Sequence, residues 1–365
     1  MNKYIELKLD CPVHQSFRVM QVGGMFDVAI EKKLQQEFCV QTPPDVSEDW
    51  KIGLLAGPSG SGKSTLAKHL YGSQIYTGYD WSPDKAVVDN FGDMNIKDIV
   101  SLLTVVGFSS PPSWIKPYHV LSNGEKFRCD LAQALSSGGL VVFDEYTSVV
   151  DRNVAKVCSA AIAKGIKSGK INCRFIAVTC HYDIAEWLEP DWVLDMAAGT
   201  AERRLLRRPP VNIDIFRCGT DAWKLFGKHH YLNRSLNPAA KSFVAMWGKE
   251  PVAFCGVLPA MGHTGCRRIS RIVVLPDYQG IGIGGRFLDA MGSIEKKDGL
   301  SLSIVASHPS ILNHCKRSPL WRCREVAKSG FVKQTSKSKA FSDKVVRYNR
   351  TVSIGRAVAS FRYTG

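Results

Sequence analysis

The sequence predicts an α/β domain followed by an α+β domain. An apolar run at 52–56 leads into a glycine-rich stretch at 57–64, and an amphipathic segment follows at 65–70. Two further apolar runs, at 140–143 and 174–179, read as buried parallel strands. The chain has 365 residues, more than the ~100–200 residues typical of one domain. These observations predict two domains, of which the first is built on a parallel sheet.

The glycine-rich stretch carries the first candidate site. It reads Gly57, Pro58, Ser59, Gly60, Ser61, Gly62, Lys63, Ser64 and Thr65. It matches the phosphate-binding pattern in the strand–loop–helix context that this pattern requires, which leaves a plain glycine-rich turn as the weaker interpretation. Its backbone N–H groups and the following helix N-terminus suit phosphate. We expect Lys63 to reach the β- and γ-phosphates of ATP, and Ser64 to ligate Mg²⁺.

Acidic residues end the next buried strand. We expect Asp144 to share the Mg²⁺ site with Ser64, and Glu145 to polarise the attacking water. Asp151 follows shortly afterwards, and His181 follows the strand at 174–179. A histidine after a strand is usually structural, but its order after two carboxylates favours a contact with the γ-phosphate.

The ordered motifs over roughly residues 15–200 resemble an ABC-type ATPase. The similarity rests on the phosphate loop, the Leu121–Glu125 signature, the acidic strand end, the Asp151 loop and His181. It implies ATP and Mg²⁺ as cofactors. It also implies that Ser122 and Gly124 close over ATP bound to a second subunit, in an ATP-dependent homodimer. The family's glutamine switch has no clear counterpart, and residues 89–91 are the candidate replacement.

The remaining elements of the first domain are predicted from local pattern. Alternation and a Gly-Gly turn predict strands at 17–22 and 25–28. Phe26 is read as a core residue, with stacking on adenine as the alternative. Helical periodicity predicts helices at 96–103 and 129–135.

The second domain is predicted to contain a hairpin, two further strands and a second glycine loop. The hairpin pairs 242–247 with 252–257, and a strand at 268–276 runs into the loop and a helix. The loop joins a strand to a helix, so its N–H groups can hold a pyrophosphate. A dinucleotide site is the competing interpretation, but no acidic residue stands suitably ~20 positions further on.

This set resembles GNAT acyltransferases over about residues 215–335. The resemblance implies acetyl-CoA or another acyl-CoA as cofactor. It also implies that the strand at 302–307 splays from 272–275 to admit the thioester. The cofactor-binding residues that it implies are Val273, Val274, Leu275, Gln279, Gly280, Gly282, Gly284 and Gly285. The family's tyrosine acid is missing, and Trp321 stands roughly in its place.

Two other residues are candidates for acid–base chemistry in the second domain. His308 leaves the predicted acyl strand, where it could deprotonate an amine or protonate the departing thiolate. A loop histidine that binds backbone is an equally weighted interpretation. Tyr231 could line the acceptor side and stack on a base, and a core or capping role is as well supported.

Charge is concentrated in the second half of the chain. Residues 211–365 hold 25 Lys and Arg against 9 Asp and Glu, whereas residues 1–210 hold 23 against 24. A net charge of +16 on one domain favours a polyanionic partner such as nucleic acid over a merely solvated face. The tail adds eight basic residues that suit phosphate contacts: Lys333, Lys337, Lys339, Lys344, Arg347, Arg350, Arg356 and Arg362.

The predicted domains are therefore an ATPase domain at 1–205, a basic linker at 206–214 and an acyltransferase-like domain at 215–365. The combination resembles ABC-type ATPases fused to a predicted acetyltransferase domain. Its second half is loosely similar to Mom-type phage enzymes that modify DNA adenine. We expect an ATP-dependent N-acyltransferase acting on a nucleic-acid base, with DNA preferred over RNA. The alternatives are an ATP-regulated protein or small-amine acetyltransferase, and a non-catalytic DNA-binding ATPase.

The expected compartment is the cytoplasm, with no membrane partner. Eleven cysteines without a disulfide framework fit a reducing compartment. The first residues lack the apolar segment of a signal peptide, and no apolar run approaches the ~18 residues of a membrane span.

Overall fold

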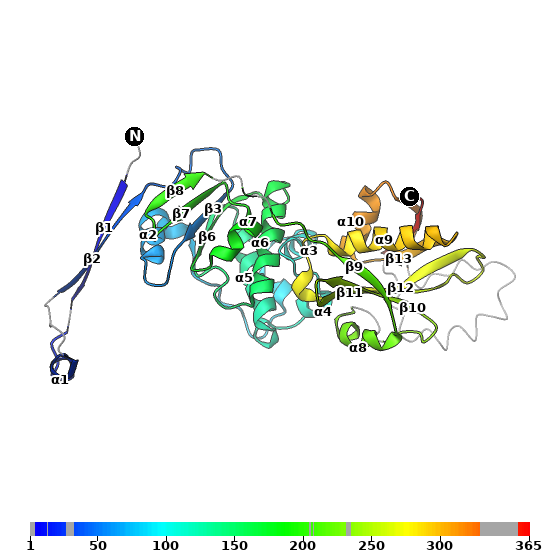
Figure 1. The fold of residues 1–365 in the computed structure, drawn as a ribbon, viewed down its shortest axis with the longest axis horizontal. Coiled ribbons are helices and arrows are strands. Elements are labelled where there is room, and N and C mark those ends of the chain that lie inside the picture. Colours follow the sequence, from blue (N-terminus) through cyan, green and yellow to red (C-terminus); the bar gives the residue numbers. More distant parts are fainter. Residues whose placement is uncertain are drawn as a thin grey trace. The chain divides into compact units, whose positions relative to one another are not determined.

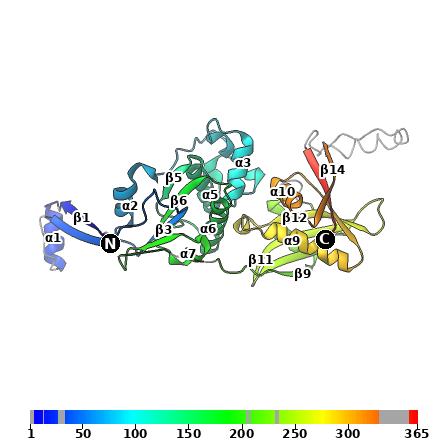
Figure 2. The same ribbon diagram turned by 90° about the horizontal axis from the view of Figure 1, so that it is seen from above.

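The structure is a computed structural model that describes residues 4–12, 14–26, 33–203, 206, 208–230, 235–328 and 357–365. The chain divides into two compact units (Figures 1 and 2). The first comprises residues 1–106 and 117–209, and the second comprises residues 107–116 and 210–365. The short segment 107–116, which the sequence assigned to the first domain, thus belongs to the second unit. The predicted α/β class is confirmed.

A six-stranded sheet forms the centre of the first unit, in the order β4-β5-β6-β3-β7-β8. Its strands are β3 (Ile52–Ala56), β4 (Ile75–Tyr76), β5 (Gly139–Phe143), β6 (Cys173–Thr179), β7 (Trp192–Asp195) and β8 (Thr200–Arg203). Every pairing is parallel except that of β7 with β8. The apolar run that precedes the phosphate loop is β3, which is buried at every position between β6 and β7. The predicted strands at 52–56, 140–143 and 174–179 are confirmed.

Beyond the helix at residues 17–26, the first unit has α-helices of which some begin at a side-chain cap and others do not. They are α2 (Lys63–Tyr71), α3 (Ile96–Val105), α5 (Asn123–Ser136), α6 (Arg152–Lys167) and α7 (Ala185–Leu188). The Asn95 side chain caps α3 by accepting from the Asp98 N–H, and Ser122 and Glu125 form a capping box on α5. The predicted helices at 96–103 and 129–135 are confirmed.

The beginning of the chain differs from its prediction. Residues 17–26 form helix α1 (Phe17–Phe26), between the antiparallel strands β1 (Tyr4–Pro12) and β2 (Lys33–Gln41). The predicted strand at 17–22 is therefore wrong, as is the part of the 25–28 strand that the structure describes. The Ser16 side chain accepts from the Val19 N–H at the start of α1, a helix-start signal that local alternation concealed.

A seven-stranded sheet forms the second unit, in the order β14-β15-β13-β12-β11-β10-β9. Its strands are β9 (Asp214–Cys218), β10 (Lys241–Trp247), β11 (Glu250–Pro259), β12 (Cys266–Val274), β13 (Ser301–Ala306), β14 (Trp321–Lys328) and β15 (Ala357–Tyr363). Its helices are α4 (Pro111–Trp114), α8 (Trp223–Phe226), α9 (Ile283–Lys297) and α10 (Pro309–Arg317). The predicted hairpin is confirmed as β10 and β11.

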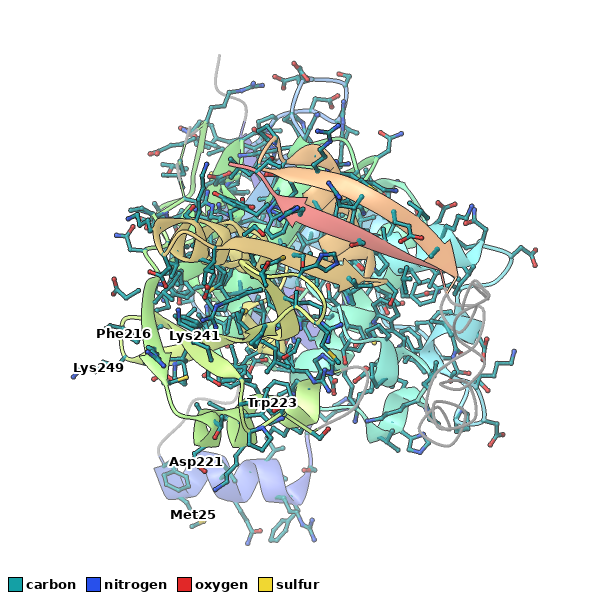
Figure 3. All side chains as sticks on the ribbon, turned by 90° about the vertical axis from the view of Figure 1, so that its right-hand side faces the viewer. Met25, Phe216, Asp221, Trp223, Lys241 and Lys249 are labelled. Atoms are coloured by element: carbon teal, nitrogen blue, oxygen red, sulfur yellow. The ribbon has the colours of Figure 1, made fainter. Side chains whose placement is uncertain are left out.

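Buried contacts fix α9 against this sheet. Glu295 on α9 is fully buried and pairs with Lys241 of β10 (3.2 Å) and Arg267 of β12 (3.1 Å); Figure 3 labels Lys241. The Tyr363 ring lies so close to Gly292 that a Cβ there would approach it to 2.2 Å. Because two cations share this one buried carboxylate, removing Glu295 would leave both of them without it.

Candidate functional sites in the two units

A cavity of about 380 Å³ lies over the phosphate loop of the first unit. Its described lining consists of Phe38, Ser59, Gly60, Gly62, Lys63, Ser64, Thr65, Asp144, Glu145, Tyr146, Ser148, Val178, Thr179 and Cys180. The carboxyl ends of β3, β5 and β6 supply most of these residues. Parallel strands place such residues together at one edge of a sheet, which is where ligands of open α/β sheets bind.

The loop has the geometry that its glycines allow. Gly60 and Gly62 have φ of 80° and 83°, in the left-handed region that favours glycine. Gly62 also begins α2, whose first turn has no side-chain cap. Lys63 Nζ donates to the Pro58 carbonyl (2.7 Å), so it closes over the loop. Gly57 and Ser61 do not line the cavity, and the buried Ser61 hydroxyl has no hydrogen-bond partner in the described structure.

Ser64 and Asp144 lie together, as predicted for a metal site. The Ser64 hydroxyl donates to Asp144 Oδ1 at 3.0 Å, and the Glu145 N–H donates to the same oxygen at 2.9 Å. Mg²⁺ is usually held by one or two carboxylates, with phosphates and water completing its shell. One hydroxyl and one carboxylate oxygen at the edge of a phosphate cavity fit that donor set. Among the described residues no cluster of three or more His, Cys, Asp or Glu could hold a metal.

Backbone strain marks the acidic strand end. Glu145 and Thr147 have φ of 51° and 68°, values that non-glycine residues rarely adopt. Strain of this kind costs ~1–3 kcal/mol per residue and is concentrated at functional sites. The result here is that Glu145 is exposed at the cavity while its neighbour Tyr146 is fully buried.

Four other predicted residues lie outside the described lining of this cavity. His181 directly follows the lining residue Cys180, and burial lowers the pKa of His181. Asp151 caps α6 by accepting from the Asn153 N–H (2.8 Å). Ser122 begins α5, and Gly124 follows in its first turn. The structure of one chain therefore does not bring the signature to its own phosphate loop.

Phe38 is a lining residue that the sequence did not single out. The Phe38 ring lies against the loop so closely that a Cβ on Gly62 would approach it to 2.9 Å. Phe26, the residue considered for adenine, is 69% exposed on α1, so its interpretation as a core residue is wrong. The signal that could have found Phe38 is an aromatic residue in an alternating strand shortly before the phosphate-loop strand.

Residues 89–91, the predicted replacement for the glutamine switch, make hydrogen bonds within their own loop through Asn90. Asn90 is buried, donates to the Ala86 carbonyl (2.7 Å) and accepts from the Ser82 N–H (3.2 Å). Residues 89–91 do not line the cavity in the described structure.

Two neighbouring strands separate in the second unit. β12 and β13 pair in parallel from Cys266 with Ser301 to Ile269 with Ile304. The pairing stops there, although β12 continues to Val274 and β13 to Ala306. The splay predicted between 272–275 and 302–307 is thereby confirmed, and it opens a wedge between the ends of the two strands.

Val274 directs its backbone toward this wedge. The Leu275 N–H donates to the Val252 carbonyl (2.9 Å), so it belongs to the ladder with β11. Because successive residues of a strand direct their backbone groups to opposite sides, Val274 directs its own away from β11. Its carbonyl accepts from Gln279 Nε2 at 2.9 Å. Val273 is 6% exposed and packs in the core.

The second glycine loop resembles the first in its backbone conformation and in the helix that follows it. Gly280 and Gly282 have φ of 93° and 99°, and Gly282 begins α9 without a side-chain cap. The first turn of this 15-residue helix thus has uncapped N–H groups. Gly284 and Gly285 have packing roles as well. A Cβ would approach Val274 to 3.2 Å from Gly284 and His314 to 2.4 Å from Gly285.

His308 follows β13, and both of its ring nitrogens have partners. Nδ1 accepts from the Ser310 N–H (3.3 Å), which caps α10, and Nε2 lies 3.4 Å from the Ser109 carbonyl oxygen. Burial lowers the pKa of His308, so the ring is neutral at pH 7. Nε2 is then the donor to Ser109. Tyr231 lies outside the described residues. Trp321 is buried and donates to Asp289, so it has a structural role.

The first unit thus has a phosphate loop beside the Ser64–Asp144 pair, and the second has a glycine loop that follows one of two splayed strands. Residues 238–316 match a family model described as the acetyltransferase (GNAT) domain. No curated protein matches the chain. The likeness to Mom-type enzymes stays a prediction.

Similar solved structures fall on both halves. The protein cbiO1 from Clostridium perfringens, part of the ABC transporter complex cbiONQ, is 18% identical, with 48% of this chain and 81% of that chain covered (TM-score 0.35). An IAA acetyltransferase from Bacillus cereus is 16% identical, with 42% and 99% covered (TM-score 0.31). The ribosomal-protein-S18-alanine N-acetyltransferase from Escherichia coli is 14% identical, with 41% and 92% covered (TM-score 0.30).

The described residues add two findings about the molecule as a whole. None of their helices has the length and apolar character needed to cross a membrane. The cysteines whose side chains the structure describes are free thiols.

Proposed function

We propose that this protein is an ATP-dependent N-acyltransferase that modifies a base of nucleic acid, with DNA preferred over RNA. The observation that carries the proposal is the presence in one chain of two glycine-rich loops, each of which precedes a helix without a side-chain cap. One loop lies beside the Ser64–Asp144 pair, and the other lies beside a splayed strand pair in a strongly basic half. The first suits a nucleoside triphosphate and the second suits an acyl-CoA.

In the first unit, residues of the cavity bind and orient ATP. Lys63 leaves the Pro58 carbonyl and contacts the β- and γ-phosphates. Ser64 and Asp144 hold Mg²⁺, which neutralises phosphate charge when bound. Glu145 orients the attacking water, His181 contacts the γ-phosphate, and the Phe38 ring stacks on the base. Ser122, Gly124 and Asp151 act on the ATP of a second subunit in a homodimer.

In the second unit, the loop at 279–285 binds the pyrophosphate of the acyl-CoA, and the residues 273–275 hold the thioester in the wedge. The amine nitrogen forms a bond with the carbonyl carbon while the carbon–sulfur bond breaks. His308, in the tautomer that leaves Nε2 unprotonated, accepts the proton of the amine at Nε2 and passes it to the departing thiolate, which ends as the CoA thiol. Backbone N–H groups stabilise the oxyanion. Tyr231 lies on the acceptor side. Closure of the ATP dimer opens the nucleic acid, since a stacked base must leave the helix before chemistry.

The decisive experiment is mass spectrometry of nucleosides from cells that express the protein, compared with cells that express Glu145→Gln. An acylated nucleoside present only with the active protein supports the proposal and identifies the base. Acyl-CoA turnover with a protein or small-amine acceptor, together with unmodified nucleosides, would favour the ATP-regulated acetyltransferase. No turnover at all would favour the non-catalytic DNA-binding ATPase.

Assembly is expected to depend on ATP. Glu145→Gln should bind ATP without hydrolysing it, so the signature of each chain can stay closed over the ATP of its partner. Sedimentation with ATP and Mg²⁺ should show a mass twice that of the 40.3 kDa chain. Adding Lys63→Ala to this variant should prevent the change, because the ATP phosphates lose their contact. A single mass that ATP does not alter would count against this assembly.

Nucleic-acid binding is expected to weaken steeply with salt. Each duplex phosphate neutralised contributes about −0.9 to the log–log slope of affinity against salt. Changing Lys337, Lys339, Arg347 and Arg350, which lie outside the described residues, to Ala should flatten the slope measured by fluorescence anisotropy.

The matched control changes the net charge by the same amount in the nearly neutral half. It replaces Lys51, Lys68, Lys85 and Lys97, which are all exposed, with Ala. It should keep the original slope. If both quadruple variants flatten it equally, the basic tail is not the binding surface.

A further inference from the structure

A single residue, Ser109, bridges the two sides of the wedge in the second unit. Its N–H donates to Gln279 Oε1 (2.8 Å), and its carbonyl oxygen lies 3.4 Å from His308 Nε2. Gln279 follows β12 and His308 follows β13, the two strands that splay. Ser109 belongs to the segment 107–116, here called the strap, which is part of the second unit.

The strap engages the groups that the proposed acyl transfer needs. Gln279 is fixed between the Ser109 N–H and the Val274 carbonyl, so a residue of the pyrophosphate loop is tied to the end of β12. The Nε2 of His308, the nitrogen that faces the strap, is occupied by the Ser109 carbonyl oxygen. While this bridge exists, His308 cannot accept a proton at Nε2 and the mouth of the wedge is crossed by backbone.

The strap is an ordered element rather than a loose loop. Phe108 and Trp114 are 1% and 5% exposed, and Trp114 Nε1 donates to the Phe108 carbonyl (2.9 Å). Residues 111–114 form the helical turn α4. These contacts give the strap a fixed shape, so a displacement of either end moves Ser109 with it.

The strap leads directly into the signature. It ends at Lys116, and Ser122 begins α5. The intervening residues are fastened to α5 as well, because the Tyr118 hydroxyl donates to Asp130 Oδ2 at 2.7 Å and Tyr118 stacks on Trp81 (4.7 Å between ring centroids). The connection between the strap and the signature helix is therefore short, and Tyr118 is hydrogen-bonded to that helix.

We propose that the strap blocks the acyl-CoA wedge when ATP is absent and leaves it when ATP is bound. Without ATP, Ser109 bridges Gln279 and His308 and keeps acyl-CoA out. Engagement of the signature by ATP in the dimer withdraws the strap, which opens the wedge and releases His308. This inference rests on the proposed function, and it adds that the two activities are coupled: acyl-CoA binds when ATP is bound.

The test measures CoA binding to the full-length Glu145→Gln protein by calorimetry, with and without ATP and Mg²⁺. Couplings between sites usually change affinity by about 5- to 150-fold, so ATP should raise the CoA affinity by about tenfold or more. By the same linkage, CoA should raise the affinity for ATP by an equal factor. A CoA affinity that ATP leaves unchanged or lowers would overturn the inference.

Two variants, each cutting one bond of the bridge, test the strap itself. Ser109→Pro removes the N–H that binds Gln279, and His308→Asn removes the imidazole that reaches Ser109 but preserves a capping side chain for α10. Either should give high CoA affinity without ATP and little further gain with it. Ser110→Ala is the matched control, because the Ser110 hydroxyl bonds to the Ser113 hydroxyl (3.1 Å) within the strap. It should behave like the unaltered strap.

The outcomes separate the two proposals. Equal, ATP-independent CoA binding in every variant would refute the strap and leave the acyltransferase proposal intact. Lower CoA affinity in both bridge variants would show that the strap completes the site, which also refutes the inference. Absence of CoA binding in every variant and condition would refute the proposed function, and the inference with it.

Discussion

Lys63→Ala is expected to reduce ATP hydrolysis by at least ~10²–10³-fold, the loss typical when one group that stabilises transition-state charge is removed. Lys63 lies in the cavity and contacts only the Pro58 carbonyl in the described structure, so its loss should not disturb the core. Glu145→Gln should have a comparable effect, because it removes the carboxylate that orients water. Phosphate release assays measure both.

The control for this prediction is Lys68→Ala. Lys68 lies on the same helix, α2, and is exposed. The substitution removes the same charge and should leave the rate within about twofold, with thermal unfolding unchanged in all three variants. Undiminished hydrolysis by Lys63→Ala would remove the ATPase assignment.

His308→Asn is expected to reduce acyl transfer by ~10²–10⁴-fold, the contribution of a positioned acid–base group. Asparagine caps helices well, so α10 should remain folded, whereas alanine would cost ~1 kcal/mol. Nucleic-acid affinity should be unchanged. Transfer assays with labelled acyl-CoA measure the rate, and full activity in His308→Asn would make Tyr231 or a bound water the next candidate.

The pH profile gives a second readout of the same residue. Burial lowers the pKa of His308 below its ordinary 6.5, so the neutral form that can accept a proton is present throughout the neutral range. The rate should therefore stay constant from pH 8 down to about 6.5 and fall only at lower pH. His308→Asn should lose that acid limb along with the rate.

The fold of the first unit could be predicted because its motifs require particular secondary structure on either side of them. A loop such as 57–64 works only between a buried strand and a helix, so the motif fixes β3 and α2. The pairing of Ser64 with Asp144 follows from parallel topology, although 80 residues separate them. The sequence analysis missed Phe38, because an aromatic residue in an alternating strand marks a candidate but does not show that this strand passes over Gly62.

The predictions that failed concern segments in which contacts between distant parts of the chain override the local sequence pattern. Residues 17–22 alternate like a strand, but the pairing of β1 with β2 leaves them as a connection without a partner strand, and they fold as a helix. The strap is the other case. Its sequence shows only a Pro-Pro break between two helices. Its contacts in the second unit include the Gln279 and His308 side chains, which lie 170 and 199 residues after Ser109.

The position of β15 has a consequence for synthesis. β15 lies between β14 and β13, although it follows both in the chain. During translation, β13 therefore leaves the ribosome with an unpaired edge. More than fifty further residues must be synthesised before its neighbour β15 emerges. Exposed edges of this kind promote association between nascent chains. The second unit should thus depend on chaperones, and ribosome stalling before residue 357 should leave it open to proteolysis while the first unit is already protected.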